Sequence, residues 1–400
     1  MDVRSLDGLK VIDFGQGIAG PYCGQLLGDQ GADVIKVEPP RGDWSRQMGR
    51  ADRHGLSGAF VAVNRNKRGI CLDLSRQTDR LAACELIAGA DVVVESFRPG
   101  VMDRLGLGWQ AMSERAPGLI YCSITGFGDS GPSSALPAGD STMQAYGGLM
   151  SIVGMQDGAP MRVGNVVSDM VAGANAFSAV LLALLEKARS GTGQRVATSL
   201  LDSILAFQAP PLTEFLRTGV LPARRGNEHP LISPSSVYAT SDGSIAVTVL
   251  DHQWTEFCRG LGVESISGDG RFRTSDDRQT HRQELNAVLG AIFRESTTAE
   301  WLHRLRQLDV LCAPVNDYAA LVADPQVVHN NVIGWSACED PLPFVRSPIH
   351  LQHSTARCDR PPMLGEHTAA VLTEVLGWEE DRISDVIGNR SQLQRSADSG

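Results

Sequence analysis

The 400-residue sequence is notable first for what it lacks. It has no run of about 18 uninterrupted apolar residues, which is the length that a membrane-spanning helix needs. Its eight cysteines include no C-x-x-C pair, so we expect reduced thiols in the core and no disulfide framework. It also lacks a basic surplus: the net charge of -10 argues against a duplex nucleic-acid binder, because phosphate contacts require a basic surface.

The chain opens with MDVRSLDGLKVIDF, which passes directly into a strand-like run. This stretch lacks the apolar segment and small-residue cleavage site of a signal peptide, so we expect a soluble protein of the cytoplasm that contacts no membrane. The hydrophobic share of 42% and charged share of 20% are ordinary for globular proteins. A length roughly two to three times that of a typical domain predicts at least two domains.

The first 200 residues alternate short β-branched runs with amphipathic stretches. Strand candidates lie at 9–14, 33–38, 69–74, 91–95 and 119–125. Repeated alternation of strand and helix predicts a mostly parallel sheet with helices on both faces, where ligands bind at the carboxyl ends of the strands. We therefore expect the chemistry in loops that follow strands.

The strongest helical pattern of the chain follows Gly164. Ser168 is the expected N-cap, MVAGANAFSAVLLALLEKARS forms the apolar body, and Gly191 ends the helix. Asp169 falls in its first turn. Beyond Ala206, frequent prolines predict a linker, and a hairpin-like pair around 241–243 opens a smaller unit.

Residues 15–20 read GQGIAG, a G-x-G-x-x-G pattern placed directly after the first predicted strand, with Glu38 at the end of the next. Taken alone, the pattern is typical of a dinucleotide-binding turn, in which a helix N-terminus holds a pyrophosphate. A tight glycine turn under a helix explains the same six letters equally well. A NAD-binding dehydrogenase is therefore one alternative, although nothing downstream indicates a hydride-transfer site.

Blocks spread over nearly the whole chain resemble the class III CoA-transferase family (CaiB/BaiF type), which includes formyl-CoA transferase, succinyl-CoA:glutarate CoA-transferase and α-methylacyl-CoA racemase. In order they are LDGLKVIDFGQGIAGPYCGQLLGDQGADVIKVEPPRGD, AVNRNKRGICLDL, DVVVESFRPGVMDRLGLGW, IYCSITGFGDSGP, GNVVSDMVAGANAFSAVLLALLEKARSGTGQRVATSLLDS, RRGNEHPLISP, DPQVVHNN and PPMLGEHT. Their order and spacing are far more specific than the glycine hexapeptide.

The resemblance implies an α/β protein with a Rossmann-like large domain, a smaller α+β domain and an interlocked homodimer. We expect residues 1–205 to form the N-terminal part of the large, CoA-binding domain and 206–224 a linker. The small domain would span 225–320, and 321–400 would return to the large domain.

Carried over position by position, the resemblance implies CoA contacts at Ile18, Ala19, Leu72, Ser96, Phe97, Arg98, Arg104, Gly139 and Asp140. Arg104 would contact phosphate, and Phe97 would offer a wall for adenine. From the residues alone, Leu72 and Ala19 are explained as well by core packing, and Arg104 by a solvated surface charge. The denser basic cluster at 65–68 would either steer phosphate or form a solvated turn.

The nucleophile of the family is an aspartate directly before an A-G-containing helix, and Asp169 of SDMVAG occupies that place. We expect its carboxylate to be ionised near neutral pH, favoured further by the positive end of its helix. It would attack an acyl-CoA thioester, forming a mixed anhydride and then an aspartyl-CoA thioester, from which a free carboxylic acid takes the CoA. The CoA thioester is a substrate here, so no tightly bound cofactor is expected. Without the resemblance, a helix-capping acid explains Asp169 better.

Gly139 separates two activities found within the family. Its racemases resemble one another in an A-G-H-D segment, and the corresponding stretch here is PAGDSTMQAYGG, with Gly139 in place of the histidine. Proton exchange at an α-carbon needs a second acid–base group, so a transferase is favoured and a racemase or epimerase is the alternative. Formyl-CoA transferases carry a tyrosine at this place and a glycine-rich flap near Thr248–Trp254, and this chain has neither. Asp140 would contact substrate or CoA, or cap a loop.

The identity of the acyl donor and of the acceptor acid does not follow from the sequence. Four basic residues are candidates for selecting a dicarboxylate, or are solvated surface charges: Arg162, Arg224, Arg225 and His229. The H-x-x-H at 350–353 has no helix and no third ligand, so we expect no metal. The expected partners are an acyl-CoA, a small carboxylic acid and a second copy of the chain. A CoA-binding protein without catalytic activity is the remaining alternative.

Overall fold

The computed structural model describes residues 4–52 and 55–397, and the chain divides into two compact units. Unit 1 contains the chain up to Leu149, Arg162–Gly219 and the chain from Val328 onward. Unit 2 contains Met150–Met161 and Val220–Val327. Both ends of the chain thus belong to unit 1. The expected small domain at 225–320 falls within the second stretch of unit 2, and its bounds stay a prediction.

Unit 1 is organised around a six-stranded sheet, which confirms the predicted α/β class. Its strands are β1 (Lys10–Asp13), β2 (Asp33–Glu38), β3 (Lys67–Cys71), β4 (Val92–Glu95), β5 (Ile120–Thr125) and β6 (Gln194–Ser199). All run parallel, in the order β3-β2-β1-β4-β5-β6. Strands β4 and β5 are buried along their whole length, as a parallel sheet covered on both faces requires. The order reverses between β1 and β4, the switch point where ligands bind in sheets of this kind.

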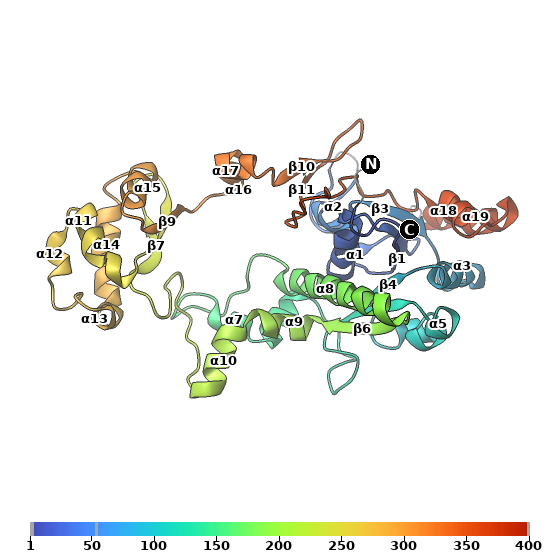
Figure 1. Ribbon diagram of the computed structural model, residues 1–400, viewed down its shortest axis with the longest axis horizontal. Coiled ribbons are helices and arrows are strands. Elements are labelled where there is room, and N and C mark those ends of the chain that lie inside the picture. The colour runs from blue at the N-terminus through green and yellow to red at the C-terminus, as the bar shows by residue number, and fades with distance from the viewer. Residues whose placement is uncertain (1–3, 53–54, 398–400) are drawn as a thin grey trace. The chain divides into compact units, whose positions relative to one another are not determined.

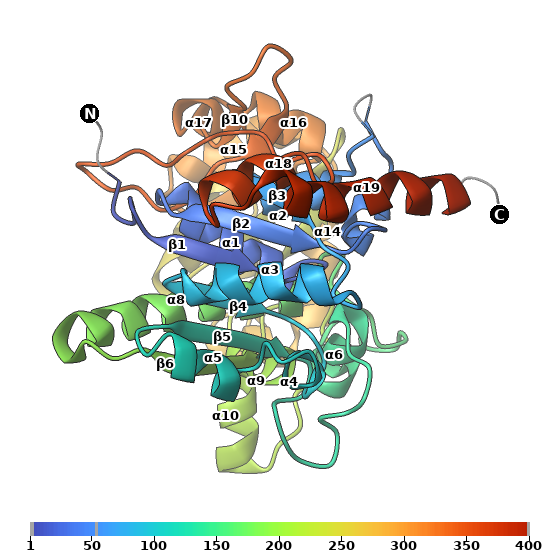
Figure 2. The ribbon, with the colours of Figure 1, turned by 90° about the vertical axis from the view of Figure 1, so that its right-hand side faces the viewer.

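Helices cover both faces of this sheet (Figures 1 and 2). One face packs against α1 (Ala19–Asp29) and α8 (Val167–Ser190). The other packs against α3 (Gln77–Ala88), α5 (Trp109–Arg115), α18 (Thr368–Glu374) and α19 (Glu380–Ala397). The last two helices therefore join the C-terminal part of the chain to the core formed by its N-terminal part.

The remaining elements of unit 1 are short. They are α2 (Gly58–Asn64), α4 (Val101–Arg104), α6 (Asp140–Tyr146), α9 (Leu200–Phe207), α10 (Ala209–Thr218), the 3-10 helix η1 (Trp44–Gln47) and the hairpin β10 (Ile333–Trp335) with β11 (Pro343–Val345). Most of the expected linker at 206–224 is helical, and its bounds as a linker stay a prediction. The two prolines of α10 occupy the first turn, where the missing N–H groups have no helical partner to lose. Two helices, α7 (Leu149–Ile152) and α17 (Pro325–His329), cross the unit boundaries.

Unit 2 holds a three-stranded antiparallel sheet of β7 (Ser235–Ala239), β8 (Ser244–Thr248) and β9 (Leu311–Pro314). The turn between β7 and β8 contains residues 241–243, which confirms the predicted hairpin. Its helices are η2 (Asp251–Gln253), α11 (Trp254–Gly260), α12 (Glu264–Ser267), α13 (Ser275–Thr280), α14 (Arg282–Phe293), α15 (Thr298–Arg306) and α16 (Tyr318–Ala323). An aromatic core of Trp254, Phe257, Phe293 and Trp301 packs against the sheet.

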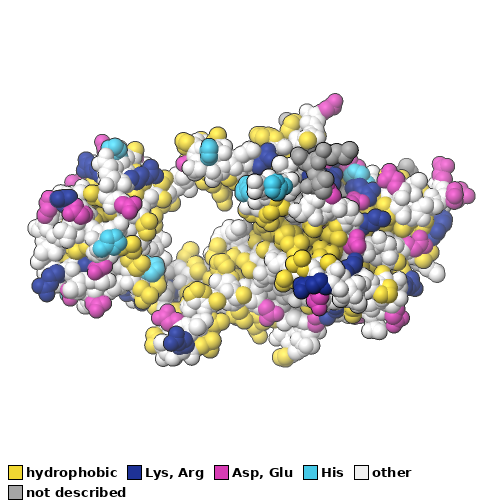
Figure 3. Space-filling model, viewed as in Figure 1, with side chains coloured by type: hydrophobic (Ala, Val, Ile, Leu, Met, Phe, Trp, Pro, Cys, Tyr) yellow, Lys and Arg dark blue, Asp and Glu magenta, His cyan; other side chains and the backbone are white. Residues whose placement is uncertain are grey.

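Helix α8 is long and apolar enough to cross a membrane by length and composition alone, and no other helix of the described chain is. Its inner side packs against α1, β5 and β6, so it is a core helix of unit 1. Its outer side leaves Leu182 and Leu185 exposed, and Figure 3 shows apolar side chains gathered on this face of unit 1. All eight cysteines are free, and five of them are buried, as expected for reduced thiols in a core.

Candidate active site

The turn after β1 rests on charged side chains buried beneath it. Asp13 Oδ1 accepts a hydrogen bond from Gly15 N (2.8 Å), while Lys36 Nζ donates to Gly15 O (2.8 Å) and to Asp43 Oδ2 (2.8 Å). Asp43 Oδ1 also accepts from Gly17 N (2.9 Å). All three charged side chains are fully buried, and a buried charge must be paired to be tolerated. The GQGIAG turn is therefore fixed by the protein before any ligand arrives.

The glycines of this turn are required by close packing. Gly17 has φ +79°, and a Cβ atom on it would lie 2.1 Å from the Trp44 ring. A Cβ atom on Gly173 of α8 would lie 2.7 Å from the carbonyl oxygen of Ala19, so α8 and the start of α1 approach each other directly. The hexapeptide thus brings the turn after β1 against the helix that carries Asp169.

Glu38 cannot serve a dinucleotide in the way that the G-x-G-x-x-G pattern would require. Its two carboxylate oxygens bind the Arg46 guanidinium (2.7 Å each), and Oε2 also accepts from Asp43 N (2.9 Å). The side chain is fully buried. A ribose hydroxyl would have to displace these bonds, which removes the main support for the dehydrogenase alternative.

The basic cluster at 65–68 turns inward, so both expectations for it, phosphate steering and a solvated turn, are wrong. Arg65 pairs with Asp29 (2.5 Å), and Lys67 Nζ donates to Asp13 Oδ2 (2.7 Å). Arg68 pairs with Asp33 at 2.5 Å and keeps a quarter of its side chain exposed. These ion pairs join β2 and β3 to α1 and β1 and contribute to the fold rather than to a binding surface.

A cleft of about 570 Å³ opens at the switch point of the sheet. It is lined by loops that follow β1, β2, β4 and β5, together with the start of α8. Nine of the residues named from the sequence lie along it: Ile18, Ala19, Ser96, Phe97, Arg98, Gly139, Asp140, Arg162 and Asp169. The tertiary structure thus brings together residues that are up to 151 positions apart, from Ile18 to Asp169.

The loops of the cleft are tied to one another. Ser96 Oγ accepts from Gln16 N (3.1 Å), joining the loop after β4 to the turn after β1. Glu95, at the end of β4, accepts from Phe97 N (2.9 Å), and burial raises the pKa of this carboxyl group to about 7. The backbone at 96–98 is therefore held in place while the side chain of Arg98 remains exposed.

Two predicted contact residues lie outside the cleft. Leu72 is 1% exposed and belongs to the core cluster that includes α3 and α18. Its side chain therefore packs in the core, the alternative that the sequence had left open. Arg104 ends α4 with an exposed side chain and does not line the cleft. The cleft also contains polar and charged residues that the sequence interpretation did not name, including Gln16, Arg41 and Thr125. Their positions in the sequence could have indicated them, because Gln16 follows β1, Arg41 follows β2 and Thr125 ends β5.

Asp169 stands in the first turn of α8, as predicted, and Gly191 ends the helix in the left-handed conformation. The predicted N-cap is wrong, because Ser168 lies inside the helix. Its N–H and its hydroxyl both donate to Asp140 Oδ1 (2.9 and 2.7 Å). Asp140 therefore caps α8 from a neighbouring helix and also lines the cleft, while its expected contact with substrate or CoA stays a prediction.

The ionisation of Asp169 differs from the sequence expectation. Burial, and after it the negative charge of Asp140, raise the pKa of Asp169 to about 7. The helix N-terminus was expected to keep this carboxylate ionised, but desolvation and a like charge oppose that effect. At neutral pH a substantial share of the molecules carry a neutral Asp169. A group whose pKa lies near the working pH is typical of a functional site.

The segment before α8 is held by the fully buried amide of Gln144. Its Nε2 donates to Asp140 Oδ2 (2.7 Å) and to Asn165 O (3.1 Å), and its Oε1 accepts from Val163 N (2.8 Å). One side chain thereby connects the cap of α8 to the backbone that enters α8. The sequence interpretation missed Gln144, because the partners of a buried amide are visible only in the folded chain.

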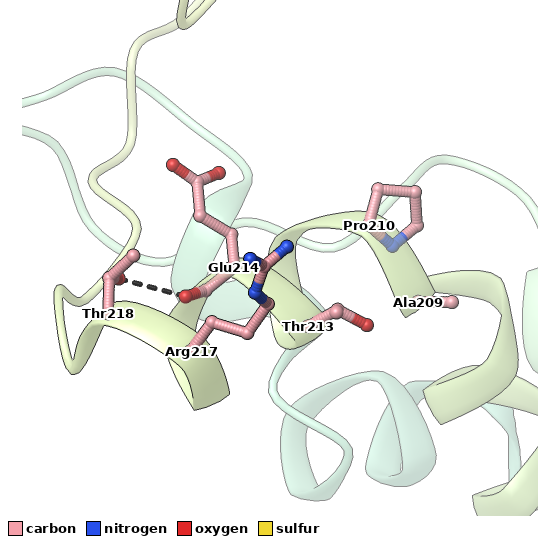
Figure 4. A pocket seen from close by; sticks show the side chains of 6 residues that line it. All are labelled: Ala209, Pro210, Thr213, Glu214, Arg217 and Thr218. Carbon is pink, nitrogen blue, oxygen red and sulfur yellow. Dashed lines mark hydrogen bonds between the residues drawn. The ribbon is translucent and has the colours of Figure 1, made fainter.

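A second hollow lies on one side of α10, where Figure 4 shows Glu214 and Arg217 beside Thr213. All of its lining residues come from this single helix, and Thr218 Oγ1 donates to Glu214 O (2.8 Å). It contains none of the candidate nucleophiles. Among residues 4–52 and 55–397, no group of three or more His, Cys, Asp or Glu side chains is arranged to hold a metal ion.

Comparison with known proteins identifies the family of the chain. A sequence model described as CoA-transferase family III matches residues 6–368. A protein of Agrobacterium fabrum named succinate–glutarate CoA-transferase is 38% identical over 381 residues, covering 92% of this chain and 95% of its own. The acetyl-CoA:oxalate CoA-transferase of Acetobacter aceti is 36% identical over 375 residues, covering 92% and 95%. The crystal structure of a CAIB/BAIF family protein from Brucella suis is 35% identical, with a TM-score of 0.87 and coverage of 93% and 99%.

Proposed function

The chain belongs to CoA-transferase family III, and from this premise we propose that it moves CoA from an acyl-CoA thioester to a free carboxylic acid, with Asp169 as the covalent nucleophile. The observation that carries the proposal is the position of Asp169. It lies in the first turn of a core helix and lines the cleft at the switch point of a parallel sheet. In the proposed reaction, this carboxylate holds CoA as a thioester after the donor acid leaves and before the acceptor acid takes the CoA.

The proposed reaction has four steps, each of which exchanges one bond at an acyl carbon. The Asp169 carboxylate attacks the donor thioester, which forms a mixed anhydride and releases CoA thiolate. The thiolate attacks the aspartyl carbonyl of the anhydride, which forms an aspartyl-CoA thioester and releases the donor acid. The acceptor carboxylate then attacks this thioester, forming a second anhydride, and the released thiolate attacks the acceptor acyl carbon. Product acyl-CoA and free Asp169 result, so neither ATP nor a reductant is consumed.

We propose that CoA binds along the loops after β1 and β4. Ala19 begins α1 and Ile18 precedes it, Ser96, Phe97 and Arg98 follow β4, and all five residues line the cleft. The N-terminus of α1 and the exposed Arg98 guanidinium suit phosphate oxygens. Arg104 stays a candidate for phosphate from outside the cleft, whereas the buried Leu72 would act only by supporting the sheet edge.

Support for a transferase over a racemase comes from the environment of Asp169. No histidine is found among the described residues that line the cleft, and a carboxylate, Asp140, lies next to the glycine at 139. Removal and return of a proton at an α-carbon would need a second acid–base group of suitable pKa. A CoA-binding protein without activity would have no need of an unpaired aspartate in the cleft.

The relatives named above act, by their names, on succinate, glutarate and oxalate. We propose a small dicarboxylic acid as the acceptor or acyl group here as well. We also propose a homodimer, because the exposed apolar side chains of Leu182, Leu185 and Phe207 on α8 and α9 are ones that a second copy would cover. Eight free cysteines suit the reducing cytoplasm as the place of action.

The direct test is to mix the purified protein with a panel of acyl-CoAs and free acids and to follow acyl exchange by mass spectrometry. The enzyme alone with an acyl-CoA should gain the mass of CoA less one water at Asp169, and Asp169→Asn should not. Exchange with no pair of substrates, combined with α-epimerisation of a branched acyl-CoA, would refute the transferase proposal.

A further inference from the structure

Three arginines line the cleft, and they come from three different segments of the chain. Arg41 follows β2 and Arg98 follows β4, beside the loops where CoA is proposed to lie. Arg162 belongs to the segment that leads into α8, and it lines the cleft together with Val166 and Asp169. The described part of the chain offers none of the three an ion pair or a side-chain hydrogen bond, and all three are exposed. Each guanidinium is therefore available to an anion that enters the cleft.

The backbone beside Arg162 is fixed although its side chain is unpaired. The next residue, Val163, donates its N–H to the buried Gln144 amide (2.8 Å), and the same amide holds Asn165 O (3.1 Å). Asn165 Oδ1 in turn accepts from Val166 N (2.8 Å). The segment from Arg162 to α8 is thus anchored to the same side chain that holds Asp140. A guanidinium on an anchored backbone is presented to the cleft at lower entropic cost than one on a loose loop.

The acidic end of the cleft needs a cation if a dicarboxylic acid is to bind there, and Arg162 is placed to supply it. During transfer one carboxyl group of an acid becomes an anhydride or thioester, but the second carboxylate of a diacid keeps its charge throughout. Asp140 and Asp169 make this end of the cleft acidic, so a further anion needs a cation beside it. Arg98 follows β4, where CoA is proposed to bind, and Arg41 follows β2, in the loop that Asp43 ties to the turn after β1. Of the three, Arg162 belongs to the segment that leads into the helix of the nucleophile.

Building on the proposed transferase activity, we infer that Arg162 is the specificity-determining residue for dicarboxylic substrates, pairing with the carboxylate that does not react. A guanidinium binds a carboxylate through two parallel hydrogen bonds, which fixes the direction of the diacid as well as neutralising it. The reacting carboxyl group is then held toward Asp169. Monocarboxylic acids of the same chain length lack this second contact.

The test compares matched acids with one common donor, acetyl-CoA. The acceptors are succinate against butyrate and glutarate against valerate, which differ only in the second carboxylate. For wild type we expect a higher kcat/KM with the diacids. Arg162→Met should lower the diacid-to-monoacid ratio of kcat/KM by roughly 30- to 100-fold, since truncating one partner of a close charge pair has effects of this size. Arg162→Lys, which keeps the charge and loses the two-point geometry, should lose about tenfold.

Arg189→Met is the matched control. Arg189 is an exposed arginine in the last turn of α8, and Asp169 stands in the first turn of that helix. It should leave the ratio unchanged. An Arg162→Met enzyme that keeps the wild-type ratio, or that loses diacids and monoacids equally, would overturn the inference. A wild-type enzyme that exchanges monoacids as well as diacids would also overturn it, while leaving the transferase proposal intact. Absence of exchange with every acid and several acyl-CoAs would instead refute the transferase proposal itself.

Discussion

The ionisation of Asp169 sets the expected pH dependence of the enzyme, and Asp140 is the residue through which to change it. Burial and the charge of Asp140 raise the pKa of Asp169 to about 7, from an ordinary value of 3.8. Only the ionised carboxylate attacks a thioester, so the reactive form is lost as pH falls through about 7. For a single ionisation, about 10% of the free enzyme is reactive at about pH 6 and about 90% at about pH 8. We therefore expect kcat/KM to rise over this interval.

Asp140→Asn removes the like charge but leaves the burial, so it should return the pKa of Asp169 only part of the way. Two unit charges several ångströms apart interact by about 1–3 kcal/mol at an effective dielectric constant near 20, and one pKa unit is about 1.4 kcal/mol. Because Asp169 is partly exposed, solvent screening reduces this effect, and we expect the midpoint to fall by about one unit. Relative to its own plateau, the variant should be about fivefold more active than wild type at about pH 6.

The substitution keeps an oxygen for Ser168, but it brings an amide group against the Gln144 amide, so the plateau itself should be lower. The comparison therefore rests on the midpoint. The assay is kcat/KM for the acyl-CoA between about pH 5.5 and about pH 8.5, because this quantity reports the ionisation of the free enzyme. Asp202→Asn is the control: this acid also stands in a first helical turn, bonded to Ser199, and does not line the cleft. A flat wild-type profile, or an unshifted midpoint in a normally folded Asp140→Asn variant, would show that Asp140 does not raise the pKa of Asp169.

Three further results follow from the same structure. Asp169→Asn should lower exchange by about 10³-fold or more while CoA binding, measured by calorimetry, persists; an active variant would show that another group is the nucleophile. Gly139→Tyr should fold normally, because the backbone there is extended and a Cβ would meet no atom within 4 Å, yet it should reduce kcat/KM for glutarate more than for oxalate. Lys36→Met should lower the free energy of unfolding in urea by about 3–5 kcal/mol, since it leaves the buried Asp43 carboxylate unpaired; a loss below about 1 kcal/mol would contradict the importance of this pair.

Many strands and helices of unit 1 could be predicted from the sequence, because each is marked by a local pattern of apolar residues. Parallel strands buried on both faces appear as short apolar runs, and the runs at 33–38 and 119–125 became β2 and β5. The helix that ends at Gly191 is equally clear from its apolar spacing and its terminal glycine. The helix within 206–224 was harder to predict, because prolines are frequent both in linkers and in the first turn of a helix, where α10 has them.

The candidate site divides in the same way. Asp169 and the residues after the strands could be named, because their places are marked by the helix start and the strand ends. The cap of α8 could not be predicted, since Asp140 lies 28 positions before Ser168 and reaches it only through the packing of α6 against α8. The basic residues at 65–68 were expected to steer phosphate or to form a solvated turn, because their partners Asp13 and Asp29 are distant from them along the chain.

Local patterns in the sequence are enough to predict the sheet, the long apolar helix and the position of Asp169 in its first turn, because hydrophobic spacing and helix-ending glycines act over a few residues. The ionisation of that aspartate and the residues that surround it depend on the folded chain. Burial, the neighbouring charge of Asp140 and the anchoring by Gln144 are long-range effects, created when distant segments exclude water from one cleft.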